Sequence, residues 1–285
     1  MSEQVEPVSD SPPPRKSALS AGISRLARGK PTQPGETYGV PGSGDTVMLS
    51  LITIGLLIFL WWLVTELGLV KPLFVPSPQS IVQKFVTVWQ NGFTGTPLWE
   101  HIAISAARVF GAFLLACAVG VPLGLAMGMS PTMRGIFDPP IEFYRPIPPL
   151  AYLPLMIIWF GIGEVSKVLL IFLSVFAPVA LGAKAGVRSA AIEQIHAAYS
   201  FGASRWQVMR HIILPSALPE ILTAMRIGIG FGWTTLVAAE MVAATSGIGY
   251  MVLSASQFLQ TSTVIMGIVV IAAIAYAFDL LMRFI

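Results

Sequence analysis

Long apolar stretches separated by short polar segments dominate the chain from about residue 47 onward. Several contain about 20 apolar residues, the length that an α-helix needs to cross ~30 Å of hydrocarbon. These stretches predict membrane spans over about 47–67, 102–129, 165–183, 218–243 and 264–284. A proline-rich apolar block between the second and third stretches completes the pattern, which predicts an all-α polytopic membrane protein with six transmembrane helices.

The proline-rich block begins as RPIPPLAYLP at Arg145, and the stretch 155–163 is expected to complete the crossing. Prolines remove backbone hydrogen bonds, and broken backbone at membrane depth is tolerated only where protein covers it or where it lines a watery cavity. Two interpretations stay open. The block is either a kinked loop at the interface or part of a translocation pathway that includes Arg145, Pro146, Pro149 and Tyr152.

Glycines recur on two of the predicted spans. Gly120, Gly124 and Gly128 stand four residues apart, which places small residues on one helix face and allows another helix to approach closely. A second glycine-rich run, 228–232, is expected to thin its helix and expose backbone.

Polar side chains follow this second run. Trp233, Thr234 and Thr235 offer an indole N–H and hydroxyls, which can bind an anion without a fixed charge that would hold it too tightly. In a homodimer each would occur twice about a central route. Alternatively, Trp233 packs against a neighbouring helix and the threonines bond to their own backbone.

Ionisable residues within the spans are few, and Arg108, Arg226 and Glu240 are the clearest cases. Such groups are costly in lipid and by default face a cavity or a partner. Snorkelling to the interface is the alternative for Arg108 and Glu240, and Arg226 can reach the headgroups. Glu240 is also a candidate for the translocation pathway.

A polar segment, HAAYSFGASRWQVMRHIILP over 196–215, separates two of the spans. Apolar residues recur at helical spacing on both sides of Gly202, which predicts two short amphipathic helices. Gly202 suits the left-handed conformation that ends a helix, and Ser204 is an N-cap candidate. Pro215 is expected to close the second helix. The segment predicts a helix–turn–helix knob, with an amphipathic loop on lipid headgroups as the alternative.

Composition supports a membrane protein and excludes several other classes. Of 285 residues, 55% are hydrophobic and 11% are charged, and the mean hydropathy is +0.76, which is too apolar for a soluble domain of this size. Cys117 is the single cysteine, so neither a disulfide framework nor a thiolate metal site is expected. The net charge of +3 is small, and the basic residues form no nucleic-acid patch.

The first 45 residues are rich in proline, serine, glycine and charge, which predicts a disordered tail before a membrane domain over 46–285. No cleaved signal peptide is expected. Basic residues concentrate in the tail, in the knob and in the connections on the same side, whereas the opposite segments hold Lys71, Lys84 and Lys167. The positive-inside rule therefore places both termini and the knob in the cytoplasm.

No catalytic or nucleotide-binding constellation emerges from the sequence. The segment nearest to the G-x-x-x-x-G-K-[ST] pattern, 182–189, lacks the lysine after its second glycine. His101, His196 and His211 are too far apart and too differently placed for a metal site, and no Ser/His/Asp set converges. We expect neither a metal nor a cofactor in this chain, and no enzymatic activity.

The alanines, the glycine and the final Ile-x-Leu-Pro of the knob resemble the "EAA" loop of the membrane subunits of ABC importers, with His196 where that family has glutamate. The runs RPIPPLAYLPLMIIWFGIGEVSK (145–167) and WTTLVAAEMVAA (233–244) resemble the taurine, sulfonate and nitrate branch of these permeases. The resemblance implies the type I importer architecture and a coupling loop over 190–215 that docks on a separate ATPase. It implies a coupling role for His196, Ala197, Ala198, Gly202, Ala203, Ser204, Arg205, Ile212, Leu214 and Pro215.

The resemblance also implies the partners and the location. They are a second copy of the chain, two copies of a cytoplasmic ATPase that uses ATP and Mg, a periplasmic binding protein, and the bilayer of a bacterial inner membrane. The implied function is import of taurine or a related small sulfonate. Import of nitrate, bicarbonate or another small anion is the alternative, and an ion-coupled secondary transporter is a further one.

Overall fold

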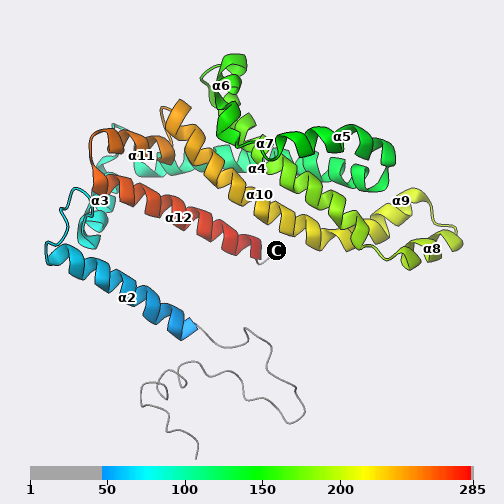
Figure 1. The fold of residues 1–285 in the computed structure, drawn as a ribbon, viewed down its shortest axis with the longest axis horizontal. Coiled ribbons are helices and arrows are strands. Elements are labelled where there is room, and N and C mark those ends of the chain that lie inside the picture. Colours follow the sequence, from blue (N-terminus) through cyan, green and yellow to red (C-terminus); the bar gives the residue numbers. More distant parts are fainter. Residues whose placement is uncertain (1–46, 284–285) are drawn as a thin grey trace, which may run out of the picture. The chain divides into compact units, whose positions relative to one another are not determined.

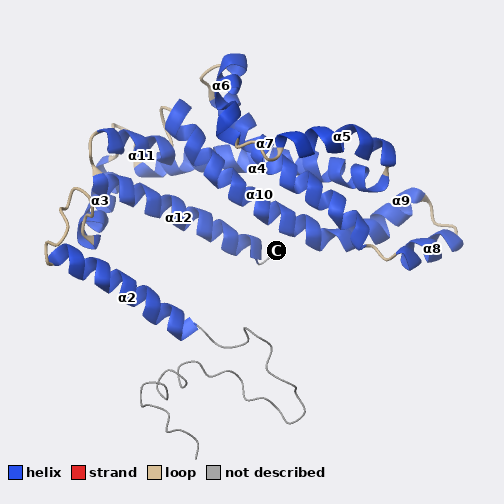
Figure 2. Ribbon diagram, viewed as in Figure 1, coloured by secondary structure: helices blue, strands red, loops and turns tan. Residues whose placement is uncertain are grey.

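The structure is a computed structural model that describes residues 47–283, and the tail expected over 1–45 lies outside this range. Within the described range every regular element is a helix, apart from an isolated bridge between Phe93 and Thr96 (Figure 2). The chain divides into two units, Met1–Val70 and Lys71–Ile285. The first contains α2 (Val47–Glu66), an apolar helix long enough to cross a membrane.

The second unit is a helical bundle centred on α7. In chain order its helices are α3 (Pro78–Asn91), α4 (Leu98–Met129), α5 (Pro131–Tyr144), α6 (Pro149–Phe160), α7 (Glu164–Gly186), α8 (Ile192–Ser200), α9 (Arg205–Val208), α10 (Leu214–Ala243), α11 (Ile248–Gln257) and α12 (Thr261–Arg283). The long helices α4 and α10 both pack along α7, and α12 lies beside α10 (Figure 1). We call the end that carries α8 and α9 the knob end, and the opposite end the far end.

Close packing of α4 on α7 depends on the glycines of α4, as the sequence predicts. A Cβ atom at Gly124 would overlap the carbonyl oxygen of Ala180, and one at Gly128 would overlap the side chain of Val187. On α10, Gly228 and Gly232 also pack inward against α7, whereas Gly230 faces open space. The expectation that the whole run 228–232 exposes backbone is therefore wrong, because two of its three glycines serve helix–helix contact.

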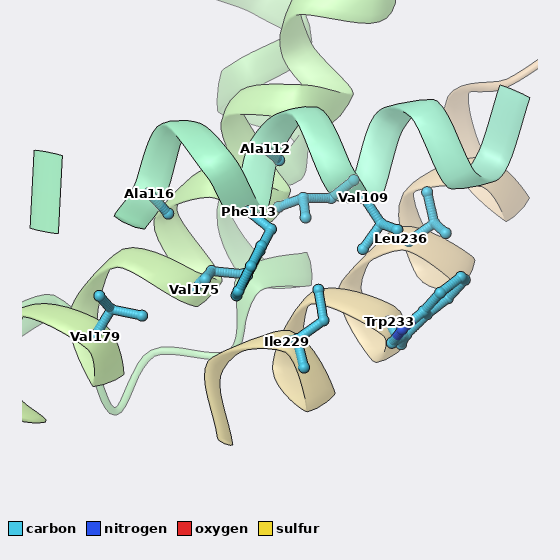
Figure 3. Packing of buried hydrophobic residues seen from close by; sticks show 10 residues of the cluster. Val109, Ala112, Phe113, Ala116, Val175, Val179, Ile229, Trp233 and Leu236 are labelled. Carbon is cyan, nitrogen blue, oxygen red and sulfur yellow. The ribbon is translucent and has the colours of Figure 1, made fainter. Parts of the chain in front are cut away.

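Apolar side chains from α4, α7 and α10 meet in one buried cluster (Figure 3). Phe113 comes from α4, Val175 from α7, and Ile229 and Trp233 from α10. Lipid is as apolar as these side chains, so the cluster stabilises the bundle through close van der Waals contact rather than through transfer out of water.

Five described helices, α2, α4, α7, α10 and α12, are long and apolar enough to span a membrane. The remaining crossing is made by α5 and α6 in series. Their contacts follow α7 from its last turn toward its first. Asp138 of α5 pairs with Lys184, and the Tyr144 hydroxyl donates to the Leu173 carbonyl. Leu153 of α6 packs against Leu170. The chain thereby returns from the knob end to the far end.

The sequence located the end of this crossing but not its beginning. It expected the stretch 155–163 to complete the span, and α6 does so over Pro149–Phe160, but its 12 residues measure only about 18 Å at 1.5 Å per residue. Gly161, with φ of +77°, ends the helix. The amphipathic α5 therefore has to supply the first part of the crossing, although its own composition does not identify it as membrane-embedded.

Candidate functional site

The knob, residues 190–215, folds through local hydrogen bonds that the sequence anticipates. Gly202 has a φ of +80° and ends α8 in the left-handed conformation. The Ser204 hydroxyl accepts a hydrogen bond from the Gln207 N–H at 3.3 Å, and the Gln207 side chain accepts one from the Ser204 N–H at 2.7 Å. This reciprocal capping box starts α9 and confirms Ser204 as the N-cap.

Pro215 does not close the second helix, contrary to expectation. It is the second residue of α10, and the helical run is continuous from Arg205 to Ala243. A π turn over Met209–Ile213 precedes it, with the Leu214 N–H donating to the Met209 carbonyl. The wider turn accommodates a residue that has no N–H to donate, so the chain enters the membrane without a break.

The helices α8 and α9 of the knob lie at one end of the bundle (Figure 1), and most residues of these two helices are exposed. No residue of α8 is buried. Phe201 at the turn is 92% exposed and Trp206 of α9 is 63% exposed. Aromatic side chains gathered on a protruding surface are typical of a site where another protein docks.

A hollow of about 340 Å³ lies between α8 and the second helix. Four predicted coupling residues line it: Ala198, Gly202, Ala203 and Ile212. The remaining predicted coupling residues do not line it. His196, Ala197, Ser204 and Arg205 are exposed, while Leu214 and Pro215 belong to the start of α10.

The far end of the bundle is built around a buried arginine. Arg108 of α4 is 4% exposed. Its Nη1 donates to Glu240 Oε1 of α10 at 2.7 Å, and its Nε and Nη2 donate to the two carboxylate oxygens of Glu164 of α7 at 2.6 and 2.7 Å. Lys167 Nζ also lies 2.8 Å from Glu164 Oε1. We call Arg108, Glu164, Lys167 and Glu240 the charge cluster; it joins the three central helices.

Glu240 is the most deeply buried member of the charge cluster. It is 0% exposed, and Ser105 donates to it at 2.7 Å. The Gly249 N–H, in the first turn of α11, donates to its other oxygen at 2.8 Å. A Cβ atom at Gly247 would overlap the carboxylate, so the loop encloses it. Arg108 and Glu240 therefore pair with each other, and neither snorkels to the interface.

The sequence did not identify Glu164 and Lys167 as partners of Arg108, nor His101 and Ser105 as supports. His101 is 0% exposed and its Nδ1 accepts the Gly247 N–H at 3.1 Å, while its Nε2 has no partner. The i, i+3 spacing of Glu164 and Lys167 at the start of a span was an available signal. The pairing with Arg108 was not, because 56 residues separate it from Glu164.

The predicted pathway residues of α10 occupy three different environments. Trp233 is 6% exposed and packs in the apolar cluster, with its indole nitrogen unpartnered. Thr234 is exposed, and its hydroxyl donates to the Phe231 carbonyl. Thr235 is 5% exposed. In this conformation the three side chains therefore do not form one polar surface.

The predicted pathway residues of the proline-rich block lie at the break between α5 and α6. Arg145 caps the end of α5, is largely exposed, and lies 3.7 Å from Glu142. Pro146 is exposed in the link, and Pro149 begins α6. Tyr152 is half-buried beside the cluster formed by α6 and α7. The break thus leaves Arg145 and Pro146 exposed between the two helices of one crossing.

A second ion pair lies toward the knob end. Arg226 of α10 contacts Asp279 of α12 at 2.6 Å, and Arg283 contacts the same carboxylate at 3.0 Å. Arg226 thus has a side-chain partner, which the sequence did not anticipate. Over residues 47–283 no three His, Cys, Asp or Glu side chains are grouped so that they could hold a metal ion.

The sequence profile of the family described as "Binding-protein-dependent transport system inner membrane component" matches residues 120–285. The taurine transport system permease protein TauC of Escherichia coli (strain K12) is 56% identical to the chain over 83% of this chain and 86% of the relative. The putative aliphatic sulfonates transport permease protein SsuC of Bacillus subtilis (strain 168) is 35% identical over 83% of this chain and 84% of the relative. The bicarbonate transport system permease protein CmpB of Synechococcus elongatus is 27% identical over 82% and 86%.

Two solved structures share the fold. Inward-facing conformations of the MetNI methionine ABC transporter give a TM-score of 0.51 at 18% identity, over 65% of this chain and 93% of that chain. An amino acid ABC transporter with histidines gives a TM-score of 0.51 at 21% identity, over 71% and 92%. At such low identity the likeness shows a common fold alone.

Proposed function

The chain belongs to the binding-protein-dependent transport system inner membrane components, the transmembrane permeases of ABC importers, and we propose that it carries taurine or a closely related small sulfonate into the cell. Membership makes it a multi-pass inner-membrane transport subunit rather than an enzyme. The assignment of the substrate rests on one observation: the 56% identity to the taurine permease TauC extends over 83% of the chain. Identity to the bicarbonate permease is 27%, which favours a sulfonate over other small anions.

The family implies an ATPase and a substrate-binding protein as partners. We infer a complex of two copies of this chain, two copies of a cytoplasmic ATPase that consumes ATP and Mg, and one periplasmic binding protein. The exposed Phe201 and Trp206, and the hollow beside Ala198, support the knob as the surface that docks on the ATPase. The departure from the family pattern at His196 leaves this apolar surface intact.

The orientation proposed from the charge distribution puts both termini and the knob in the cytoplasm and the charge cluster at the periplasmic end. ATP binding closes the ATPase dimer and draws the two knobs together. Because α9 continues through the π turn into α10, movement of a knob is transmitted along a single helix. The transmembrane halves then rock from inward-open to outward-open, and hydrolysis resets them.

The translocation pathway is also a proposal. The break at Arg145, Pro146, Pro149 and Tyr152 supports it, because a helix interrupted within a crossing requires a protein-lined or watery surrounding. Thr234 is exposed and available to the same route. Trp233, Thr235 and Glu240 are closed off in this conformation and would join the pathway only after the helices move.

Reconstitution tests the proposed function directly. The permease, its ATPase and its binding protein are placed in proteoliposomes, and entry of radiolabelled taurine is followed with and without ATP. We expect ATP-dependent uptake that unlabelled taurine and short alkanesulfonates compete away and that nitrate and bicarbonate do not. Uptake that follows an imposed ion gradient without ATP, or competition by bicarbonate alone, would contradict the proposal.

A further inference from the structure

The carboxylate of Glu164 is bound by two cationic side chains, those of Arg108 and Lys167. Arg108 contacts both of its oxygens through Nε and Nη2 at 2.6 and 2.7 Å, and Lys167 Nζ contacts Oε1 at 2.8 Å. Both cations are 4% exposed, whereas the Glu164 side chain is 59% exposed. The binding groups are thus fixed inside the bundle, and the group that they bind is at the surface.

The two carboxylates around Arg108 differ in how easily they can leave. Glu240 is fully buried and accepts further hydrogen bonds from Ser105 and the Gly249 N–H. Glu164 has only the two cations as side-chain partners. It is the first residue of α7 and follows the link Gly161–Gly163, so a rotation of its side chain moves the carboxylate into solvent without disturbing the buried pair.

Charge balance defines what can replace Glu164. Arg108 and Lys167 carry two positive charges, and Glu240 supplies one negative charge that stays in place. The site without Glu164 therefore has a net charge of +1, and a buried cation without a partner is costly. A group with one negative charge restores local neutrality. It must offer at least two oxygens to the planar guanidinium and one to the Lys167 ammonium, which a sulfonate does. Taurine is a zwitterion, so its own ammonium has to remain outside the site, on the exposed side.

We propose that Arg108 and Lys167 bind the sulfonate group of the incoming substrate, and that the Glu164 carboxylate fills this site until substrate displaces it. The inference rests on the proposed function, because it takes its substrate class from there. Exchange of one anion for another keeps the two cations paired throughout. The far end of the bundle can then open at the α6–α7 link when a sulfonate has arrived, and stays closed when none has.

Equilibrium dialysis tests the site without the binding protein. The intact permease–ATPase complex is dialysed against radiolabelled taurine in a low-halide buffer, since chloride would compete for the same cations. In Glu164→Gln the internal competitor is gone, and if Glu164 fills the site in nine molecules out of ten, affinity should rise about 10-fold over the wild type. Glu100→Gln is the matched control: it makes the same chemical change near the far end, at a residue with no ion pair.

A second change separates the site from a general charge effect. Lys167→Gln in the Glu164→Gln background should abolish the gain in affinity, because it removes one of the two cations. Co-elution with the ATPase and a cooperative thermal transition show that each variant is folded, and Glu164→Ala repeats the measurement with a different side chain.

The outcomes are distinct. Equal binding by the wild type and both Glu164 variants would overturn the site and leave Glu164 as a structural partner of Arg108. If the Glu164 variants bind no taurine but hold the binding protein more tightly in a parallel pull-down, the site belongs to an acidic side chain of that protein and the sulfonate proposal is overturned. If the wild-type complex imports taurine while the variants bind none, the site fails and the proposed function stands. If the wild type imports no sulfonate, the proposed function fails whatever the dialysis shows.

Discussion

The two ends of the bundle use polar and apolar groups in opposite ways. At the far end, Arg108 and Glu240 are buried and every cation or carboxylate of the charge cluster has a partner within the chain. At the knob end, α8 buries no residue, and Phe201 and Trp206 project from the surface. At the far end the charged side chains are paired within the chain, whereas at the knob end large apolar side chains are left exposed.

This difference indicates where each end gains its stability. A buried charge without its partner costs several kcal/mol, so the far end has to be complete within the subunit. Exposed aromatic side chains cost little in water and contribute when a partner covers them. We therefore expect mutations of the buried Arg108–Glu240 pair to destabilise the protein strongly, and mutations in the knob to leave it folded but uncoupled.

The largest loss of stability is expected from Arg108→Met. The change keeps an unbranched apolar stem and leaves Glu240 buried without its cation, which should cost about 3–5 kcal/mol. Thermal unfolding of the solubilised protein measures the effect as a marked fall in melting temperature. Arg226→Met is the matched control, since Arg226 and Asp279 are both partly exposed and their pairing is screened. Equal falls in melting temperature for the two variants would contradict the proposed difference between the buried and the exposed ion pair.

A smaller loss is expected from Gly124→Ala on α4. The added Cβ meets the Ala180 carbonyl and Ala183, so α4 and α7 must separate, at a cost of about 1–3 kcal/mol. Gly111→Ala on the same helix has open space around it and should stabilise the helix by roughly 0.5–1 kcal/mol. Melting temperatures that move in the same direction would show that close approach of the two helices is unnecessary.

The smallest loss of stability, within about 0.5 kcal/mol, is expected from Ala198→Asp in the knob. The carboxylate enters the hollow beside Gly202, where the ATPase is proposed to dock. We expect substrate-stimulated ATPase activity in the reconstituted complex to fall about 10-fold, as burial of an unpaired charge at an interface costs at least 1.4 kcal/mol. Thr94→Asp, on an exposed turn at the other end, should leave coupling unchanged. If Ala198→Asp couples like the wild type, the knob is not part of the interface with the ATPase.

The sequence predicted best those features that depend on near neighbours. Gly202 and Ser204 shape the knob through hydrogen bonds to residues three to five positions away, so composition and spacing were sufficient to find them. The packing role of the α4 glycines could be predicted equally well, because a helix presents the same face every three or four residues. The closing role given to Pro215 was wrong, since a π turn five residues long intervenes.

Features that join distant parts of the chain could not be predicted in this way. The sequence identified Arg108 and Glu240 as costly charges in a membrane, but they are 132 residues apart and nothing in their spacing pairs them. Trp233 illustrates the same limit: two interpretations stood open until the side chain was placed among apolar residues of α4 and α7.

The sequence by itself determined the class of protein, five of its membrane-spanning helices and the local shape of the knob, because hydropathy, helical periodicity and capping act over a few turns of chain. Only the tertiary structure decided that α5 and α6 share one crossing and that Glu164 occupies a site made by Arg108 and Lys167. These contacts depend on how α4, α7 and α10 pack, and close packing of long helices is set jointly by residues that lie far apart in the chain.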